Sequence, residues 1–291
     1  MTRQILITGA TGKTGAIAAV TLLDEGHRVR AFVHRLDERA DRLAKAGAEV
    51  VTGDLLDVDA VSRAAKGVDA AYLTYPPASG MIDASATFLQ AVEENGVPAI
   101  VNMSQMAARR DAADLESRQH WIAERMLDHF SGTVTHLRPT AFAEWLIGFW
   151  QQATNEIRLP FADARGALVA AEDLGRVIAA IITDPQPHAG KIYSLYGPVE
   201  LDYNQIAAVM TRVLGRRVTY VPVSLDEFRS ALERRGRDPH LVEHLVNVAV
   251  DYRNGLYAGT NDTVRTLTGT EPLTVEAFIE RNRQSFDQGA A

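Results

Sequence analysis

Short apolar and β-branched runs alternate with segments of helical spacing through the first half of the 291-residue chain. This alternation predicts a parallel sheet whose strands are joined by crossover helices. The runs are apolar on both alternating faces, as expected for strands that helices cover above and below. The predicted strands span residues 4–8, 28–33, 49–53, 69–74, 99–104 and 133–139.

The regular alternation of strand and helix patterns ends after about Pro139. Residues 171–185 have the pattern of a helix and residues 191–197 that of a further strand, whereas most of the remaining chain has a helical pattern. We therefore predict an α/β fold: a Rossmann-type, doubly wound parallel sheet with a smaller C-terminal α/β lobe at the edge where such sheets bind ligands. The sheet domain is expected at 1–140, and 141–291 mainly form the lobe, with some segments returning to the sheet.

The charge and cysteine content of the chain argue against several classes of binding partner and chemistry. The chain has 30 basic and 37 acidic residues and a pI of about 5.6, so it offers no general attraction to nucleic acid or to an anionic membrane. It has no cysteine, which excludes disulfides and thiolate chemistry. No charged and apolar leader precedes the first strand, and the apolar stretches are far shorter than the roughly 20 residues that span a bilayer. We expect a cytoplasmic protein.

A glycine turn with the sequence TGATGKTG follows the first strand. Its Gly-Lys-Thr resembles part of the loop that holds nucleoside triphosphates, but that loop needs a glycine where Ile7 stands. Gly9, Gly12 and Gly15 fit the dinucleotide spacing instead. Small residues there let a pyrophosphate approach the amides and the positive dipole end of the following helix. The alternative is an ordinary turn.

Polar side chains near this turn refine the expected ligand. Thr11, Lys13 and Thr14 would add two hydroxyls and a cation around the same phosphates. In NAD-binding proteins a carboxylate near the end of the second strand holds the ribose hydroxyls, whereas this strand is followed by His34 and Arg35. A guanidinium there would pair with the 2′-phosphate of NADP. We predict NADP(H) as the cofactor, with NAD(H) as the second choice, and a solvated surface arginine as the alternative.

Residues after the third and fourth strands complete this part of the predicted cofactor site. Asp54 and Leu55 suit an adenine, whose exocyclic amine would donate to the carboxylate while its ring packs on the leucine. An ordinary loop aspartate is the alternative. Thr74, Tyr75 and Pro76 lie on a stiff proline loop, which we expect to form a wall of the cofactor pocket.

The motifs, in their order and spacing, resemble the NmrA-like branch of the atypical short-chain dehydrogenases/reductases over nearly the whole chain. The resemblance implies a Rossmann domain with a small C-terminal lobe that binds NAD(P). Some members of the family are quinone or other NADPH-dependent reductases, and others are redox-sensing regulators that do not turn the cofactor over. The segments that carry the resemblance are TGATGKTG, VRAFVHR, GDLLD, VNMSQ, HWIAERML, THLRPTAF and LTGTEPLTVEAFIERNRQSF.

The chain departs from the usual short-chain dehydrogenase pattern at the proton donor. That pattern combines a serine with Tyr-x-x-x-Lys on one helix. Ser104 ends the fifth strand as in the pattern, but the helix carries His120 and Glu124. Their spacing puts both on one helix face, so His120 would donate the proton near neutral pH and Glu124 would orient it. The alternative is that His120 contacts the nicotinamide without moving protons.

Residues after the sixth strand are expected to lie near the nicotinamide and the substrate. Pro139 and Phe142 are expected to contact the cofactor. Phe142 also opens an aromatic group with Trp145, Phe149 and Trp150, which we expect within three helical turns. This group would stack on a flat substrate such as a quinone or belong to the core of the lobe. The eight scattered histidines suggest no metal site.

These patterns together predict an NAD(P)H-dependent oxidoreductase that prefers NADPH and passes hydride to a quinone or a small conjugated carbonyl compound. The alternative from another class is a non-catalytic NADP(H) sensor that acts through a protein partner. A third reading is an isomerase or epimerase that uses the cofactor transiently. The oligomeric state stays open.

Overall fold

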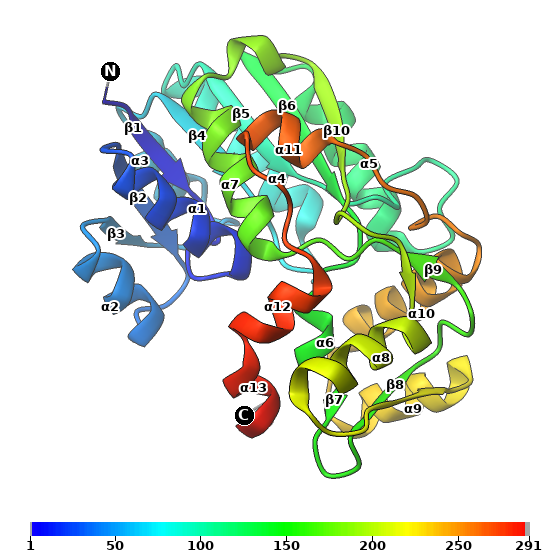
Figure 1. Cartoon of the computed structure of the whole chain (residues 1–291). Coiled ribbons are helices and arrows are strands. Elements are labelled where there is room, and N and C mark those ends of the chain that lie inside the picture. The colour runs from blue at the N-terminus through cyan, green and yellow to red at the C-terminus, as the bar shows by residue number, and fades with distance from the viewer. Residues whose placement is uncertain (1, 289–291) are drawn as a thin grey trace. The chain divides into compact units, whose positions relative to one another are not determined.

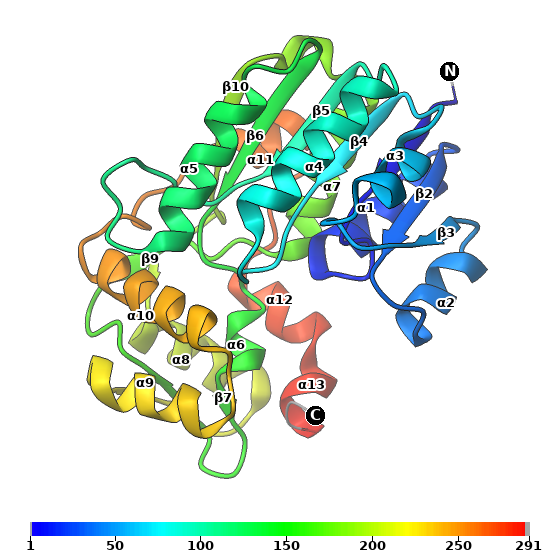
Figure 2. The same cartoon turned by 180° about the vertical axis from the view of Figure 1, so that it is seen from behind.

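The computed structural model describes residues 2–288, which fall into two compact units (Figures 1 and 2). The sheet unit comprises Met1–Arg138 and Leu174–Ser194. The lobe unit comprises Pro139–Asp173 and Leu195–Ala291. No helix within residues 2–288 combines the length and apolarity needed to cross a membrane.

The sheet unit alternates strands and helices as predicted. All six strands of the first half and the later strand at 191–197 are present, so this part of the prediction is confirmed. Its elements are β1 Gln4–Ile7, α1 Lys13–Asp24, β2 Arg28–Val33, α2 Glu38–Lys45, β3 Glu49–Thr52, α3 Val58–Ala65, β4 Ala70–Leu73, α4 Met81–Glu94, β5 Ala99–Met103, α5 Leu115–Leu127, β6 Thr133–Pro139, α7 Ala171–Thr183, the 3-10 helix Gln186–His188 and β10 Lys191–Leu195.

These strands form one sheet in the order β10-β6-β5-β4-β1-β2-β3. From β1 the chain moves outward through β2 and β3, and then returns to the other side of β1 with β4. Ile5 of β1 therefore lies between Val29 of β2 and Ala70 of β4, in parallel register with both. The strand order reverses between β1 and β4, and doubly wound sheets bind ligands beyond the carboxyl ends of the strands at such a point.

Helices cover both faces of this sheet. Figures 1 and 2 show α1 and α7 on one face and α3, α4 and α5 on the other. Every position of β1, β4 and β5 is buried, as the continuous apolar runs predicted. The helix α7 packs so closely on α1 that a Cβ at Gly175 would clash with Ile17.

The lobe unit contains a three-stranded sheet, β12-β8-β7, and the two-stranded sheet β11-β9. Its core is aromatic: the rings of Phe161 and Tyr252 stack with centroids 4.3 Å apart. Capping boxes open α8 at Asp202 and α9 at Ser224. The elements are α6 Trp145–Gly148, β7 Trp150–Gln151, β8 Glu156–Leu159, β9 Arg165–Gly166, β11 Leu201–Asp202, α8 Tyr203–Leu214, β12 Thr219–Pro222, α9 Leu225–Arg234, α10 Pro239–Arg253, α11 Thr263–Thr268, α12 Val275–Arg281 and α13 Arg283–Gln288.

Candidate functional site

The turn between β1 and α1 is built around glycine. Gly9 has a φ of +56°, and a Cβ there would lie 2.5 Å from Cγ2 of Thr74, so a side chain would be both strained and blocked. A Cβ on Gly15 would lie 2.5 Å from the carbonyl oxygen of Gly9. Gly12 is the N-cap of α1 and provides no side-chain cap. The N–H groups of the first turn are therefore left for an anion.

The side chains of this turn divide into two groups. Lys13 is exposed and Thr11 half-buried, as a phosphate ligand requires. Thr14 is buried, and its hydroxyl shares a 3.0 Å hydrogen bond with the phenol of Tyr72, whose pKa is raised to about 12 by burial. This bond ties α1 to β4. The contact of the Thr14 hydroxyl with the phosphates stays a prediction, and the backbone N–H of Thr14 is a second group that it offers them.

An unpaired cation follows β2. Arg35 is exposed, and its guanidinium has no hydrogen bond or ion pair within residues 2–288. Arg39, by contrast, is bound to Asp37, with Nη2 and Oδ2 2.6 Å apart. His34 is also exposed and lies 3.9 Å from a carboxylate oxygen of Asp54. Arg35 is therefore a cation at the carboxyl end of β2 that a bound anion would meet without displacing a protein partner.

The loop after β3 lies next to the end of β2, because the two strands are paired. Asp54 is exposed, and its Oδ1 accepts a hydrogen bond from the N–H of Leu56. This bond fixes the carboxylate and leaves its second oxygen able to accept from a ligand. Leu55 is half-buried against the core beneath the sheet. Both predicted adenine contacts thus lie at the same edge of the sheet as Arg35.

The loop after β4 is tied directly to the glycine turn. The hydroxyl of Thr8 accepts a 3.0 Å hydrogen bond from the N–H of Thr74. Tyr75 is half-buried and Pro76 exposed just beyond it. Burial, followed by the charge of Asp54, raises the pKa of Tyr75, so its phenol stays protonated at neutral pH. The structure therefore places this loop at the edge where the sequence predicts a pocket wall.

The helix α5 pairs its residues differently from the prediction. Nε2 of His120 lies 3.5 Å from Oε1 of Glu116, which is 2% exposed. Glu124 is fully buried and accepts hydrogen bonds from Nε and Nη2 of Arg138 at 2.8 and 2.5 Å. The prediction that Glu124 orients His120 is wrong, because that carboxylate neutralises Arg138 of β6. The signal for Glu116 was present in the sequence as an acid four residues before the histidine.

Buried polar atoms gather near the end of β5 and the start of α5. Within residues 2–288 eight buried side-chain nitrogen or oxygen atoms lack a hydrogen-bond partner, and half of them belong to Ser104, Gln105, Ser117 and Gln119. A buried polar group without a partner costs about 1–3 kcal/mol, so these four side chains are candidates for contact with a ligand. A carboxamide like that of nicotinamide offers both donors and an acceptor for them. Only Ser104 was singled out from the sequence.

Two predicted cofactor contacts belong to the lobe unit. Pro139 is the last residue of β6 and is buried. Phe142 is half-buried and forms an isolated bridge with Val169. Their contact with a cofactor stays a prediction.

The aromatic residues after Phe142 are arranged differently from the expected three helical turns. The helix α6 is a single turn, Trp145–Gly148, and Trp150 lies in the strand β7. Trp150 is a core residue: it is 5% exposed, and its indole N–H donates to the carbonyl of Phe286. Trp145 and Phe149 are half-buried and meet edge to face, with ring centroids 6.2 Å apart. Stacking on a substrate therefore stays a prediction only for the half-buried rings.

Comparisons with known proteins agree with this architecture. The model of the NmrA-like family matches residues 1–278. A Streptomyces griseus protein named (4-alkanoyl-5-oxo-2,5-dihydrofuran-3-yl)methyl phosphate reductase is 31% identical over 97% of this chain and 99% of its own length.

Solved structures share the fold across both units. The NADPH complex of an NADPH-dependent quinone oxidoreductase from Escherichia coli superimposes with a TM-score of 0.83, at 24% identity over 95% of this chain and 99% of that one. The NADP complex of NmrA, a negative transcriptional regulator, gives a TM-score of 0.83, at 20% identity over 99% of this chain and 98% of that one. The predicted Rossmann-type fold is confirmed, and the predicted reductase class agrees with the name of the Streptomyces relative. The chain belongs to the NmrA-like family.

Proposed function

We propose that this chain is an NADPH-dependent reductase that passes a hydride to a quinone or a small conjugated carbonyl compound. The observation that carries the proposal is the glycine turn at the reversal point of the sheet, where Gly9 and Gly15 leave no room for a side chain. A named relative that reduces a furanone phosphate supports the reductase class, and a structural neighbour that reduces quinones supports the substrate class. The net charge of -7 favours a small molecule over nucleic acid as the ligand.

Different residues at the sheet edge would bind different parts of the cofactor. The amides of the first turn of α1 and the ammonium of Lys13 would bind the pyrophosphate. Arg35 would bind the 2′-phosphate, because its guanidinium has no partner within the described chain. Asp54 and Leu55 would hold the adenine. The nicotinamide would then extend toward Ser104, whose hydroxyl is buried without a partner among the described residues.

The chemistry requires one hydride and one proton for each quinone reduced to a hydroquinone. Bound NADPH would supply the hydride. His120 is the proposed proton donor, since it is half-buried next to Glu116, whose charge also acts on Tyr75 in the loop after β4, and histidine side chains transfer protons near neutral pH. Glu116 is the proposed positioning residue, because its buried carboxylate lies 3.5 Å from Nε2 and would hold the ring in one orientation.

Two substitutions test these roles. His120→Gln should lower kcat at least tenfold with little change in the Kd of NADPH. Glu116→Gln should lower kcat by a smaller factor and leave KM nearly unchanged, because the neutral amide holds the imidazole in place less firmly than the carboxylate does. His129→Gln, an exposed histidine just after α5, is the matched control. Equal kcat for His120→Gln and the control would exclude His120 as the proton donor.

The function itself is tested with purified protein by calorimetric titration of NADPH, followed by its absorbance in the presence of quinones, enones and aldehydes. Saturable oxidation with one substrate class is the expected result. The alternative is a non-catalytic NADP(H) sensor, which the absence of Tyr-x-x-x-Lys in α5 favours and to which the fold of a transcriptional regulator lends support. Tight binding without turnover across the whole panel would replace the reductase with the sensor.

A further inference from the structure

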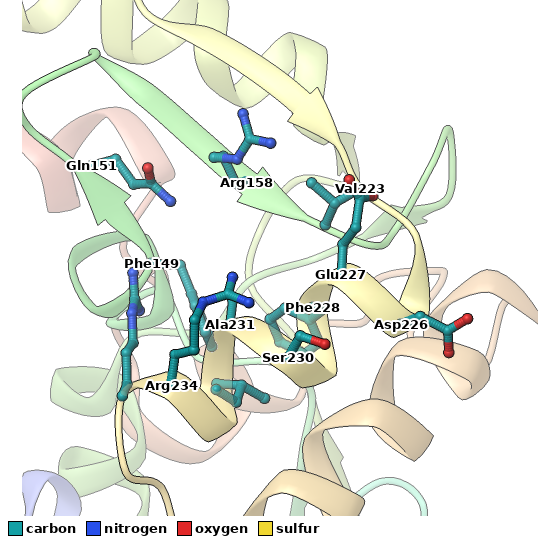
Figure 3. Close-up of a pocket in the computed structure, with 12 residues that line it drawn as sticks. Phe149, Gln151, Arg158, Val223, Asp226, Glu227, Phe228, Ser230, Ala231 and Arg234 are labelled. Carbon is teal, nitrogen blue, oxygen red and sulfur yellow. The ribbon is translucent and has the colours of Figure 1, made fainter.

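A second candidate ligand site lies inside the lobe unit. A cavity of about 530 Å³ opens between α9 and the strands β7 and β8 (Figure 3). Small-molecule sites typically have volumes of 300–1,000 Å³, so the cavity has room for a compact organic ligand. Its walls come entirely from residues 149–235, and it shares no residue with the predicted cofactor site.

The middle of the cavity is apolar and aromatic. The rings of Phe149 and Phe228 lie with centroids 5.6 Å apart and planes inclined by 50°. Phe228 and Leu232 are buried at 4% and 3% exposure, whereas Phe149 is half-buried. The part of Phe149 that stays exposed is an aromatic surface on which a flat apolar group would pack.

The charged residues of α9 that line the cavity differ in sign between the two ends of the helix, whereas Arg229 and Glu233 do not line it. Asp226 and Glu227 lie in its first turn, and Arg234 and Arg235 lie at its last turn. Arg234 lies eight positions after Asp226, which corresponds to about 12 Å along a helix. Glu227 is already engaged, since its carboxylate accepts a 2.8 Å hydrogen bond from the N–H of Ser224. The cavity therefore has an acidic end and a basic end.

The basic end is open to an anion. Neither guanidinium, of Arg234 or of Arg235, has a hydrogen bond or ion pair with another residue of the described chain. Figure 3 shows the guanidinium of Arg234 directed from α9 toward the strands, across the space that the cavity occupies. Arg158, from β8, adds a third guanidinium to the lining and is paired with Glu156 at 3.2 Å.

We propose that this cavity binds an amphipathic organic anion, namely an aromatic ring system that carries one carboxylate. The ring packs on Phe149 in the apolar middle, and the carboxylate binds Arg234 and Arg235 at the end of α9. A neutral molecule of the same shape keeps the apolar contact but loses the charge-assisted bonds, which for exposed arginines amount to about a tenfold difference in Kd.

Calorimetric titration with 2-naphthoate and with its neutral isostere 2-naphthamide tests the proposal. The unaltered protein should bind 2-naphthoate about tenfold more tightly. Arg234→Gln should remove most of this preference, whereas Arg237→Gln, an exposed arginine just beyond α9 that does not line the cavity, should retain it. Ala231→Phe, which places a ring inside the cavity, should weaken both ligands at least tenfold.

Each titration is made with and without saturating NADPH. Because the two sites share no residue, the Kd of 2-naphthoate should be unchanged by NADPH, and this result is readable even if NADPH fails to bind and the proposed reductase is wrong. The proposal is overturned if 2-naphthoate shows no saturable binding or no preference over 2-naphthamide. Equal effects of Arg234→Gln and Arg237→Gln, or unchanged binding to the Ala231→Phe variant, would also overturn it.

Discussion

Arg35 decides the preference for the phosphorylated cofactor if it binds the 2′-phosphate. In Arg35→Gln the side chain keeps its approximate length but loses the charge. A hydrogen bond to a charged group is worth about 1.5–3 kcal/mol. Arg35 is exposed and therefore screened by solvent, so we take about 1.4 kcal/mol, which is a tenfold change in Kd. NADH has no 2′-phosphate, and its Kd should not change.

The measurement is a calorimetric titration of the unaltered protein and Arg35→Gln with NADPH and with NADH. Arg42→Gln is the matched control, because Arg42 is an exposed arginine on α2 a few residues further along the chain. Raising the ionic strength should weaken NADPH binding to the unaltered protein more than to Arg35→Gln. The reasoning fails if Arg35→Gln weakens both cofactors equally, or if Arg42→Gln matches its effect on NADPH.

Three further substitutions test the scaffold around the site. Gly15→Ala should weaken NADPH binding at least tenfold by calorimetry, since its Cβ would lie 2.5 Å from a carbonyl oxygen of the turn, whereas Gly148→Ala, with nothing within 4 Å, should bind normally. Arg138→Met should lower the free energy of unfolding in urea by about 3 kcal/mol, because the buried Glu124 loses both of its hydrogen bonds to Arg138 and keeps only the longer 3.6 Å ion pair with Arg125. A similar free energy of unfolding for the two proteins would contradict this. Burial lowers the pKa of His136 below 6.5, so the unfolded chain binds its proton first and stability should fall as the pH drops below about 6.5. His136→Gln should flatten that dependence in chemical unfolding at pH 5 to 7, and an unchanged slope would exclude His136 as its source.

The strands and the glycine turn could be predicted because their signals are local. A strand covered on both faces must be apolar at successive positions, as in β1, β4 and β5. The positive φ of Gly9 and the close contact between Gly15 and the carbonyl oxygen of Gly9 are local requirements of this turn, whereas the contact between Gly9 and Thr74 is long-range. Apart from that contact, the residues that determine these structures are close together in the sequence.

The pairing on α5 could not be predicted, because helical periodicity is symmetric. Glu116 and Glu124 are both four residues from His120, and the i, i+4 rule does not choose between them. The choice is made by Arg138, which reaches Glu124 from β6. The bond between Thr14 and Tyr72 could not be predicted either, since Tyr72 lies 58 residues further along the chain.

The polar groups near the glycine turn fall into two classes: those that hold the scaffold together and those that are available to bind a ligand. Thr8 and Thr14 use their hydroxyls to tie β1 and α1 to β4, and this fixes the glycine turn in place. A hydroxyl used in this way has less capacity left for a phosphate than an unpaired group has. Lys13, Arg35 and Ser104 have no such bond within the described chain, although all three lie at the same edge of the sheet. A binding site needs polar groups whose partners are missing until the ligand arrives, so the cofactor contacts are best sought among the unpaired groups and the scaffold among the paired ones.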